Sequence, residues 1–233
     1  MSGKIYMIPT TLGDSPVEKV IPVYVLELIR TTKYFIVENV KTSRRYLKKV
    51  DPSINIDALT FFTLNKHTKE EDIISFITPA LEGINIGIIS EAGCPGIADP
   101  GSSIVEIAHK KNIAVVPLVG PSSILLALIS SGMNGQKFTF HGYLSKDKSE
   151  RTKEIKKLEA RAGKGETQIF METPYRNMQL LEDVIKSCNL NQKLCIALNI
   201  TLENEFIKTK TIKEWKNKIP DLNKQPCIFI LGL

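Results

Sequence analysis

The sequence predicts an α/β protein built from two lobes, and three observations support this fold class. Short apolar runs alternate with longer amphipathic segments, which is the pattern of mostly parallel strands connected by helices. A segment rich in proline, glycine and serine, residues 117–123, interrupts the alternation, which then resumes. With 42% hydrophobic and 24% charged residues, the chain of 233 residues can bury a sizeable core. We therefore expect an N-terminal lobe at 1–119 and a C-terminal lobe at 120–233.

The N-terminal lobe is expected to form a sheet of short strands covered by helices. Apolar runs predict strands at residues 4–8, 33–37, 60–64, 85–90 and 114–117. Amphipathic segments predict helices at 16–30, around 44–48, at 70–81 and at about 102–110. Pro16 and Glu18 favour the start of the first of these helices, because proline has a suitable fixed φ and a carboxylate interacts well with a helix N-terminus.

The C-terminal lobe is expected to repeat the alternation after an apolar helix that Gly120 and Pro121 open. Strands are predicted at 137–141, 167–171 and 193–198, and helices at 178–188 and around Trp215. The strongly charged segment 145–165 is interpreted as a basic helix. At the end of the chain we expect residues 203–210 to pair with the apolar strand 227–231.

Composition and residue spacing argue against several classes of protein. The four cysteines (Cys94, Cys188, Cys195, Cys227) and three histidines (His67, His109, His141) have neither zinc-ligand spacing nor the pattern of a catalytic triad. We therefore expect no metal site. The apolar stretches are too short to span a bilayer and no secretory segment is visible, so a cytosolic location is expected. The net charge of +6 is compatible with an anionic partner such as RNA.

The most informative stretch is the loop 90–101, Ser-Glu-Ala-Gly-Cys-Pro-Gly-Ile-Ala-Asp-Pro-Gly, between a predicted strand and a predicted helix. Glycine lets the backbone approach a ligand closely, and proline stiffens the loop. Ligands of open α/β sheets bind beyond the carboxyl ends of the strands, so this loop is a candidate binding site. The alternative is a tight connection that only turns the chain. The loop is neither a Walker loop nor a Gly-x-Gly-x-x-Gly fingerprint, which disfavours an ordinary ATP or NAD enzyme.

A second loop, 117–123, ends in two serines. Ser122 or Ser123 can cap the following helix, or can bind a polar ligand at the helix N-terminus. The sequence leaves both interpretations open.

Five stretches in this order resemble one enzyme family. They are Ile5-Tyr-Met-Ile-Pro-Thr-Thr-Leu-Gly-Asp14, Ser90 to Gly101, Pro117-Leu-Val-Gly-Pro-Ser122, Gly142-Tyr-Leu-Ser145 and Met171-Glu-Thr-Pro-Tyr-Arg176. They are similar to the motifs of the bacterial 16S ribosomal RNA cytidine 2'-O-ribose methyltransferases, within the tetrapyrrole methylase superfamily. The resemblance extends from about Lys4 to Glu205.

The resemblance implies two α/β lobes, each with a mixed sheet flanked by helices, a homodimer, and S-adenosylmethionine in the cleft between the lobes. Matched by position, the cofactor contacts fall on Thr11, Ser90, Ala92, Gly93, Cys94, Ile97, Ser122, Ser123, Glu172, Leu198 and Asn199. A sulfonium cofactor carries its own leaving group, so the protein mainly supplies alignment and electrostatics.

The sequence also departs from the family pattern. Glu38-Asn39-Val40-Lys41 stands where the family has Glu-Asp-Thr-Arg, Glu91 stands where it has Asp, and Thr11 replaces a proline. Residues 64–67 and 198–202 differ as well. The chain is therefore interpreted as a divergent relative, with the cofactor scaffold kept and the charges that face the substrate changed.

Glu38 is the first candidate for the base that takes a proton from a ribose hydroxyl, and Glu172 is the second; each can instead be a solvated or structural carboxylate. Arg44 and Arg176 are candidate contacts to RNA phosphates, although Arg176 can equally pair with a carboxylate. The basic helix through Arg151 to Lys164 can steer RNA or form an ordinary exposed face. Alternatives to an RNA methyltransferase are a methyltransferase for a porphyrin-like or other small molecule, and a module that binds cofactor or RNA without turnover.

Overall fold

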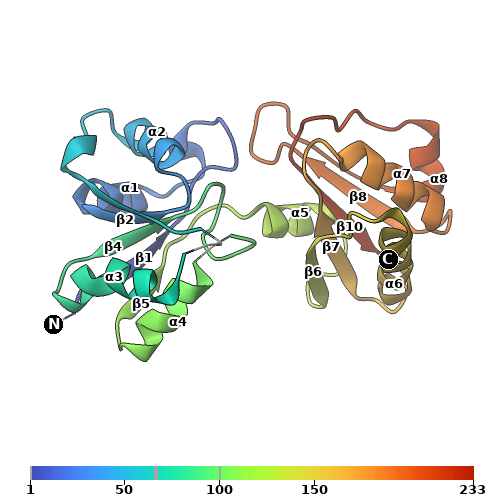
Figure 1. The fold of residues 1–233 in the computed structure, drawn as a ribbon. Helices are drawn as coiled ribbons and strands as arrows, with labels where there is room; N and C mark the ends of the chain where they lie inside the picture. Colours follow the sequence, from blue (N-terminus) through green and yellow to red (C-terminus); the bar gives the residue numbers. More distant parts are fainter. Residues whose placement is uncertain (1, 66–67, 100) are drawn as a thin grey trace. The chain divides into compact units, whose positions relative to one another are not determined.

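A computed structural model describes residues 2–65, 68–99 and 101–233; Met1, Lys66, His67 and Pro100 lie outside the described residues. Two features of the sequence therefore lie partly outside the described residues. They are the difference from the family pattern at residues 64–67, which includes Lys66 and His67, and the loop 90–101, which includes Pro100. The chain divides into two compact units, Met1–Ser122 (unit 1) and Ser123–Leu233 (unit 2), and each is described by itself (Figure 1). The boundary expected from the sequence, after Val119, lies in the loop that precedes this division.

Unit 1 contains a five-stranded sheet in the order β3-β2-β4-β1-β5, in which every pair of neighbours is parallel. The strands are β1 (Lys4–Ile8), β2 (Tyr34–Val37), β3 (Thr60–Thr63), β4 (Ile86–Ile89) and β5 (Ala114–Pro117). Parallel strands end at the same edge of a sheet. Here the register aligns the last residues of β1, β2 and β4, so the loops that follow them start side by side.

Helices cover both faces of this sheet (Figure 1). They are α1 (Val23–Thr31), α2 (Val40–Val50), α3 (Glu70–Leu81) and α4 (Ser102–Lys110), with 3-10 turns at Val17–Lys19 and Ile56–Ala58. Buried residues of α1 and α2 form one apolar cluster with the sheet, and buried residues of α3 and α4 form another. Burial on both faces explains why β4 reads as a continuous apolar run instead of an alternating one.

Unit 2 contains a five-stranded mixed sheet in the order β6-β7-β10-β8-β9. Its strands are β6 (Phe138–Tyr143), β7 (Thr167–Met171), β8 (Lys193–Leu198), β9 (Phe206–Thr211) and β10 (Cys227–Gly232), and its helices are α5 (Ser123–Ser131), α6 (Lys148–Ala162), α7 (Asn177–Ser187) and α8 (Ile212–Asn217). Residues of α6, α7 and α8 share one core around the fully buried Trp215, while α5 packs against β8, β9 and β10.

The predicted α/β fold with two sheets is confirmed, and several segments begin and end as expected. The mixed sheet expected in each lobe is found in unit 2, whereas the sheet of unit 1 is wholly parallel. The single helix expected at 16–30 is wrong. Pro22 cannot donate a helical hydrogen bond and its ring obstructs the preceding turn, so α1 begins only at Val23.

The strand pairing expected at the end of the chain is also wrong. Residues 206–211 pair with β8, and β10 lies between β7 and β8. Both neighbours of β10 run antiparallel to it. This central position buries all six residues of β10, which accounts for its apolar sequence.

The basic segment forms α6, but its first arginine does not face solvent. Arg151 is 3% exposed and binds the carboxylate of Asp183 on α7, with Nη2–Oδ2 and Nε–Oδ2 distances of 2.7 and 2.9 Å. Its Nη1 donates to the carbonyl groups of Ser145 and Lys146. Arg151 therefore joins α6 to α7 and cannot take part in the RNA steering suggested for this helix.

Candidate functional site

Three loops of unit 1 interlock at the carboxyl edge of its sheet: residues 9–14 after β1, 90–99 after β4 and 118–122 after β5. The backbone N–H of Thr10 donates to the carbonyl of Gly93 at 2.9 Å, and the Ser90 hydroxyl donates to the same carbonyl at 2.5 Å. The Cys94 thiol donates to the carbonyl of Pro121, with an Sγ–O distance of 3.4 Å. Three of the five motifs singled out in the sequence thus meet in one place, at the carboxyl edge of the unit 1 sheet.

The approach of these loops requires glycine at two positions. Gly93 has φ of +72°, and a Cβ built there would lie 2.9 Å from the carbonyl oxygen of Pro121. At Gly120 an added Cβ would overlap the ring of Pro9. A side chain at either position would push the loops apart, because close contact with backbone or with a proline ring cannot be relieved by rotation of a flexible chain. The glycines therefore fix the spacing of the loops.

The predicted cofactor residues of unit 1 differ in exposure. Thr11 and Ser90 are buried, Gly93 is buried, and Cys94 and Ser122 are half-buried. Ala92 and Ile97 are exposed, and Ile97 leaves 48% of its surface open. A large exposed apolar side chain on a stiff loop is a suitable contact for an apolar part of a ligand.

A small cavity at the same edge is lined by Glu38, Ser90 and Asp99. Glu38 follows β2 directly and is exposed. Burial, helped by the nearby charges of Glu38 and Glu91, raises the pKa of Asp99 to about 6, while a hydrogen bond from the Glu91 backbone opposes this rise. Its Oδ2 is buried and has no hydrogen-bond partner among the described residues. Asp99 is thus a carboxyl group that exchanges a proton near neutral pH.

Asp99 is not among the candidate site residues that the sequence indicates. The aspartate stands at the end of the loop 90–101, one residue before a proline, and that position within a candidate binding loop is the signal that could have identified it. Its partial burial and its two acidic neighbours come from the folding of β2 and the loop together, and a linear pattern does not show them.

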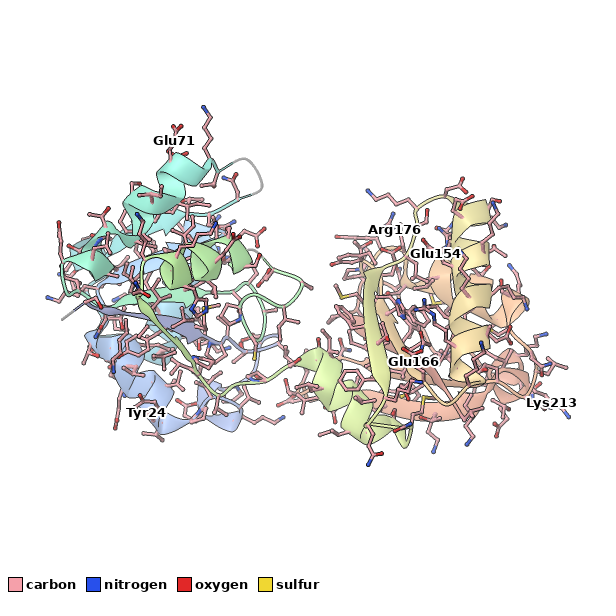
Figure 2. All side chains as sticks on the ribbon, turned by 90° about the horizontal axis from the view of Figure 1, so that it is seen from below. Tyr24, Glu71, Glu154, Glu166, Arg176 and Lys213 are labelled. Atoms are coloured by element: carbon pink, nitrogen blue, oxygen red, sulfur yellow. The ribbon has the colours of Figure 1, made fainter. Side chains whose placement is uncertain are left out.

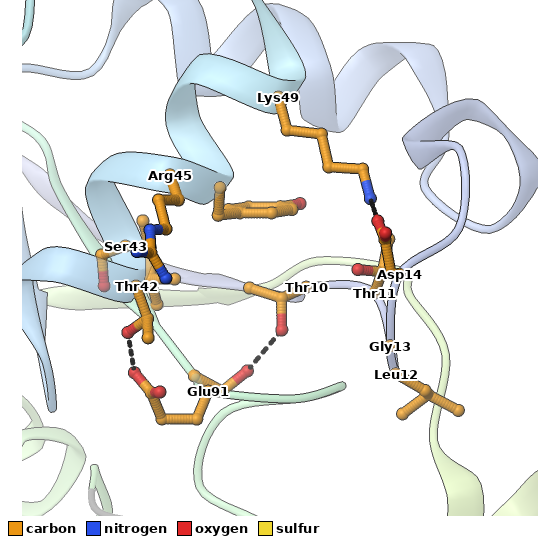
Figure 3. Close-up of a pocket in the computed structure, with 13 residues that line it drawn as sticks. Thr10, Thr11, Leu12, Gly13, Asp14, Thr42, Ser43, Arg45, Lys49 and Glu91 are labelled. Atoms are coloured by element: carbon orange, nitrogen blue, oxygen red, sulfur yellow. Dashed lines mark hydrogen bonds and ion pairs between the residues drawn. The ribbon is translucent and has the colours of Figure 1, made fainter. Parts of the chain in front are cut away.

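A larger cavity of about 240 Å³ lies between the loop 9–14, α2 and the end of β4 (Figure 3). Its lining residues are Thr10, Thr11, Leu12, Gly13, Asp14, Thr42, Ser43, Arg45, Tyr46, Lys49, Ile89, Ser90 and Glu91. Arg45 lines this cavity, whereas the expected substrate contact, Arg44, is not among the lining residues. The guanidinium of Arg44 lies over the ring of Phe61, with its central carbon 5.4 Å from the ring centroid.

The position that departs most visibly from the family pattern has a local structural role. Asn39 is the N-cap of α2, and its side-chain oxygen accepts hydrogen bonds from the backbone N–H groups of Lys41 and Thr42 at 2.9 and 3.4 Å. Asparagine and aspartate are both good N-caps. The change from the expected aspartate therefore keeps the helix start and removes a negative charge beside Glu38.

In unit 2, the two charged residues of the motif 171–176 pair with each other. Glu172 is 5% exposed, and its Oε1 lies 2.5 Å from Nη2 of Arg176. Figure 2 labels Arg176 among the side chains of unit 2. The same oxygen accepts the backbone N–H of Thr173 at 2.6 Å. The ion pair engages the Glu172 carboxylate and the Arg176 guanidinium with each other. Of the two interpretations of Arg176, pairing with a carboxylate agrees with this geometry.

Leu198 and Asn199 lie at the end of β8 and are buried. The register pairs Leu198 with Cys227, and pairs Met171 at the end of β7 with Ile228, so both strand ends flank the start of β10. Asn199 has φ of +50° and donates from Nδ2 to Oε1 of Gln225 at 2.6 Å. Glu172 and Asn199 therefore belong to the same edge of the unit 2 sheet, while Ser123 begins α5.

The remaining thiols are structural. Cys188, Cys195 and Cys227 are buried free cysteines, and burial raises the pKa of each thiol, that of Cys188 to about 12. Among residues 2–65, 68–99 and 101–233, three or more acidic, histidine or cysteine side chains do not gather in a way that could hold a metal ion. Over the same residues, helices with the length and apolar character needed to cross a membrane are absent.

The fold and the glycine-rich loops place the chain in a known class of enzyme. Residues 4–216 match the family of tetrapyrrole (corrin/porphyrin) methylases, and the chain belongs to this family. It is therefore a methyltransferase of the class that uses S-adenosylmethionine.

Individual relatives narrow the comparison. The chain is 29% identical to the ribosomal RNA small subunit methyltransferase I of Buchnera aphidicola subsp. Schizaphis graminum, over 99% of its own length and 78% of the relative. It is 30% identical to the protein of the same name from Halalkalibacterium halodurans, over 88% of its own length and 68% of the relative. Among solved structures, a diphthine synthase superposes with a TM-score of 0.68 at 14% identity, covering 99% of this chain and 90% of that one, which supports the fold alone.

Proposed function

We propose that this enzyme transfers a methyl group from S-adenosylmethionine to ribosomal RNA, at a ribose 2'-hydroxyl. The relatives that match most of the chain are named as small-subunit ribosomal RNA methyltransferases. The single observation that carries the proposal is the interlocking of the loops around Gly93, because the motif shared with that family forms a stiff surface at the usual ligand-binding edge.

The cofactor is proposed to lie against these loops of unit 1. Gly93 and Gly120 allow backbone groups to come close, and the apolar side chain of Ile97 stays available to a ligand. Thr11, Ser90, Ala92, Cys94 and Ser122 complete the proposed contacts in unit 1. Ser123, Glu172, Leu198 and Asn199, in unit 2, remain predictions from the resemblance.

When bound, S-adenosylmethionine supplies a methyl group on a positively charged sulfur, and the electron pair of the broken carbon–sulfur bond stays on the sulfur. The protein therefore has only to orient the acceptor and to accept the proton of the acceptor's hydroxyl group. Glu38 is the proposed acceptor of the hydroxyl proton, because its carboxylate is exposed at the end of β2. Asp99 lines the same cavity and is the second proposed base. Glu172 is the weaker candidate, since Arg176 already occupies its carboxylate.

A small-molecule acceptor is the second candidate function, and the description of the family as corrin and porphyrin methylases favours it. A cofactor- or RNA-binding module without turnover is the third. One assay distinguishes the three candidate functions. The enzyme is incubated with tritiated S-adenosylmethionine and either small ribosomal subunits from a strain that lacks this methylation or, separately, porphyrin acceptors. We expect label in the RNA; label only in the porphyrin would support the second function, and no label would support the third.

The cofactor site can be tested before the acceptor is known. Calorimetric titration with S-adenosylhomocysteine should show binding to the native enzyme and none to Gly93→Trp, because the indole would fill the space beside Pro121. Gly165→Trp is the matched control. Gly165 also has positive φ, but open space surrounds it, so this variant should bind normally if both proteins fold to the same circular dichroism spectrum.

We also propose that the enzyme is a cytosolic homodimer, as the resemblance implies. Light scattering of the purified protein at several concentrations tests the dimer, and fractionation of cells that express the tagged chain tests the location.

A further inference from the structure

The cavity between the loop 9–14 and α2 shares Thr11 and Ser90 with the proposed cofactor contacts, and its other lining residues include the charged side chains of Arg45, Lys49 and Glu91. At about 240 Å³ it is smaller than the cavities that enclose whole drug-sized ligands, so a part of a larger molecule is a more suitable occupant. It opens at the carboxyl edge of the sheet, and it shares Ser90 with the smaller cavity that holds Glu38 and Asp99.

Arg45 is the main donor of this cavity. It is exposed on α2, and its guanidinium has neither an ion pair nor a hydrogen bond with any described residue. A guanidinium presents its N–H groups in a planar fork that fits a phosphate. Lys49 also lines the cavity, but it pairs with Asp14 at 2.6 Å. The Asp14 side chain is fully exposed, so water and salt weaken this pair and Lys49 can exchange its partner.

The cavity also contains an acceptor. Glu91 lies in the loop after β4, and its Oε1 accepts a hydrogen bond from the Thr42 hydroxyl at 2.6 Å, which fixes the carboxylate beside α2 (Figure 3). The hydroxyl of Thr11 is not hydrogen-bonded to any part of the chain that the structure describes. A carboxylate repels a phosphate, and it binds a sugar hydroxyl well. The donors and the acceptor together fit a ligand that carries both groups.

We propose that this cavity binds one ribose–phosphate unit of the RNA acceptor, with Arg45 on the phosphate and Glu91 on a ribose hydroxyl. The inference rests on the proposed function, because that function makes RNA the acceptor. Contacts to phosphate position a nucleic acid, and a contact to the 2'-hydroxyl distinguishes RNA from DNA. The site therefore positions the strand beside the methylated nucleotide and excludes DNA.

The test measures binding of a labelled, unstructured RNA oligonucleotide and of the DNA with the same sequence, by fluorescence anisotropy at several KCl concentrations. Arg45→Gln should weaken RNA binding about 5- to 10-fold and lower the slope of log Kd against log salt by about 0.7, the value for one phosphate contact on a single strand. Lys48→Gln is the matched control, since Lys48 lies outside the cavity lining on the same helix and its Nζ donates to the Pro52 carbonyl. It should change both quantities much less.

Glu91→Ala tests the second half of the site. It should reduce the preference for RNA over DNA at least threefold, because only RNA loses a contact. S-adenosylhomocysteine should bind Arg45→Gln and the native enzyme equally, since Arg45 is not among the proposed cofactor contacts. Equal weakening by Arg45→Gln and Lys48→Gln, an unchanged RNA preference in Glu91→Ala, or weaker S-adenosylhomocysteine binding by Arg45→Gln would each overturn the inference.

The methyl-transfer assay separates this inference from the proposed function. If the native enzyme methylates RNA and Arg45→Gln has an unchanged KM for RNA, the function stands and the site is wrong. If the native enzyme binds RNA through Arg45 and transfers no methyl group to it, the site stands and the function is wrong. A native enzyme that does not bind the RNA oligonucleotide contradicts the site directly.

Discussion

Asp99 combines a position beside two other carboxylates with an oxygen that lacks a hydrogen-bond partner among the described residues. Its environment disfavours the charged form, mainly through burial, and raises its pKa from 3.8 to about 6. A folded-state pKa above the unfolded value means that the contribution of this group to stability is complete below pH 4 and is lost as the pH rises through 6. At neutral pH the folded protein therefore tolerates an unfavourable charge, which is a frequent property of functional sites.

Asp99→Asn should consequently be more stable than the native enzyme at pH 8 and equally stable at pH 3.5 to 4. A shift from 3.8 to about 6 corresponds to about 3 kcal/mol, and partial exposure of the side chain reduces the expected gain to about 1–2 kcal/mol. Urea unfolding at the two pH values measures it. Glu27→Gln, an exposed carboxylate on α1, serves as the control and should differ little at either pH. An Asp99→Asn variant whose advantage does not grow between pH 4 and pH 8 would contradict the assigned environment.

At the scale of single elements, α2 depends on its first residue. The helix carries five cationic side chains among its eleven residues and no acidic residue in its first turn, so the Asn39 cap is the favourable feature of its N-terminus. Asn39→Ala should destabilise the protein by about 1 kcal/mol, whereas Asn39→Asp should keep the cap and interact favourably with the helix dipole. Thermal unfolding of both variants checks this. Equal loss in both would show that the cap does not determine the stability of α2.

The pair of α6 and α7 depends on one buried ion pair. Arg151 and Asp183 are 3% and 6% exposed at their side chains, and removal of one partner leaves an uncompensated buried charge. Arg151→Met should therefore destabilise unit 2 by about 3–5 kcal/mol, while the double variant Arg151→Met/Asp183→Leu should recover most of that loss. Lys153→Gln breaks an exposed pair with Glu150 on the same helix and should cost at most about 0.5 kcal/mol. Urea unfolding followed by Trp215 fluorescence reports on unit 2, because the indole is buried in its core.

The sequence reveals elements better than it reveals their partners. Helix and strand periods are local, so 4–8, 70–81, 102–110, 114–117, 167–171 and 193–198 begin and end as predicted. The partner of a strand depends on segments far away in the chain, and the pairing of β9 was therefore assigned to the wrong strand. A local pattern also does not show whether a charged side chain faces solvent or a buried partner. The pattern of α6 marks a basic helix, but it does not show that Arg151 turns inward to Asp183.

Across the whole molecule, the loops that carry the motifs could be predicted, because glycine and proline are rare enough to mark them. The positions of the side chains around these loops could not be predicted. Arg45 and its neighbour Arg44 are indistinguishable in the sequence. The structure separates them, because one lines a cavity and the other lies over Phe61. The residues proposed for this site lie on α2 or near the carboxyl ends of β1, β2 and β4, and the parallel register of these strands brings their ends to one edge.

This arrangement predicts which segments a bound cofactor should protect from hydrogen exchange. Saturating S-adenosylhomocysteine, at about 100 times its Kd, should stabilise the enzyme by about 2.7 kcal/mol through mass action. Hydrogen exchange should slow in residues 9–14, 90–99 and 118–122, whose hydrogen bonds to one another already limit their motion. The edge strand β3 is separated from β1 by two strands, β2 and β4, and should exchange as before. Gly93→Trp should lose both the stabilisation and the local protection. Protection confined to β3 and its flanking segments, or stabilisation that persists in Gly93→Trp, would place the cofactor away from these loops.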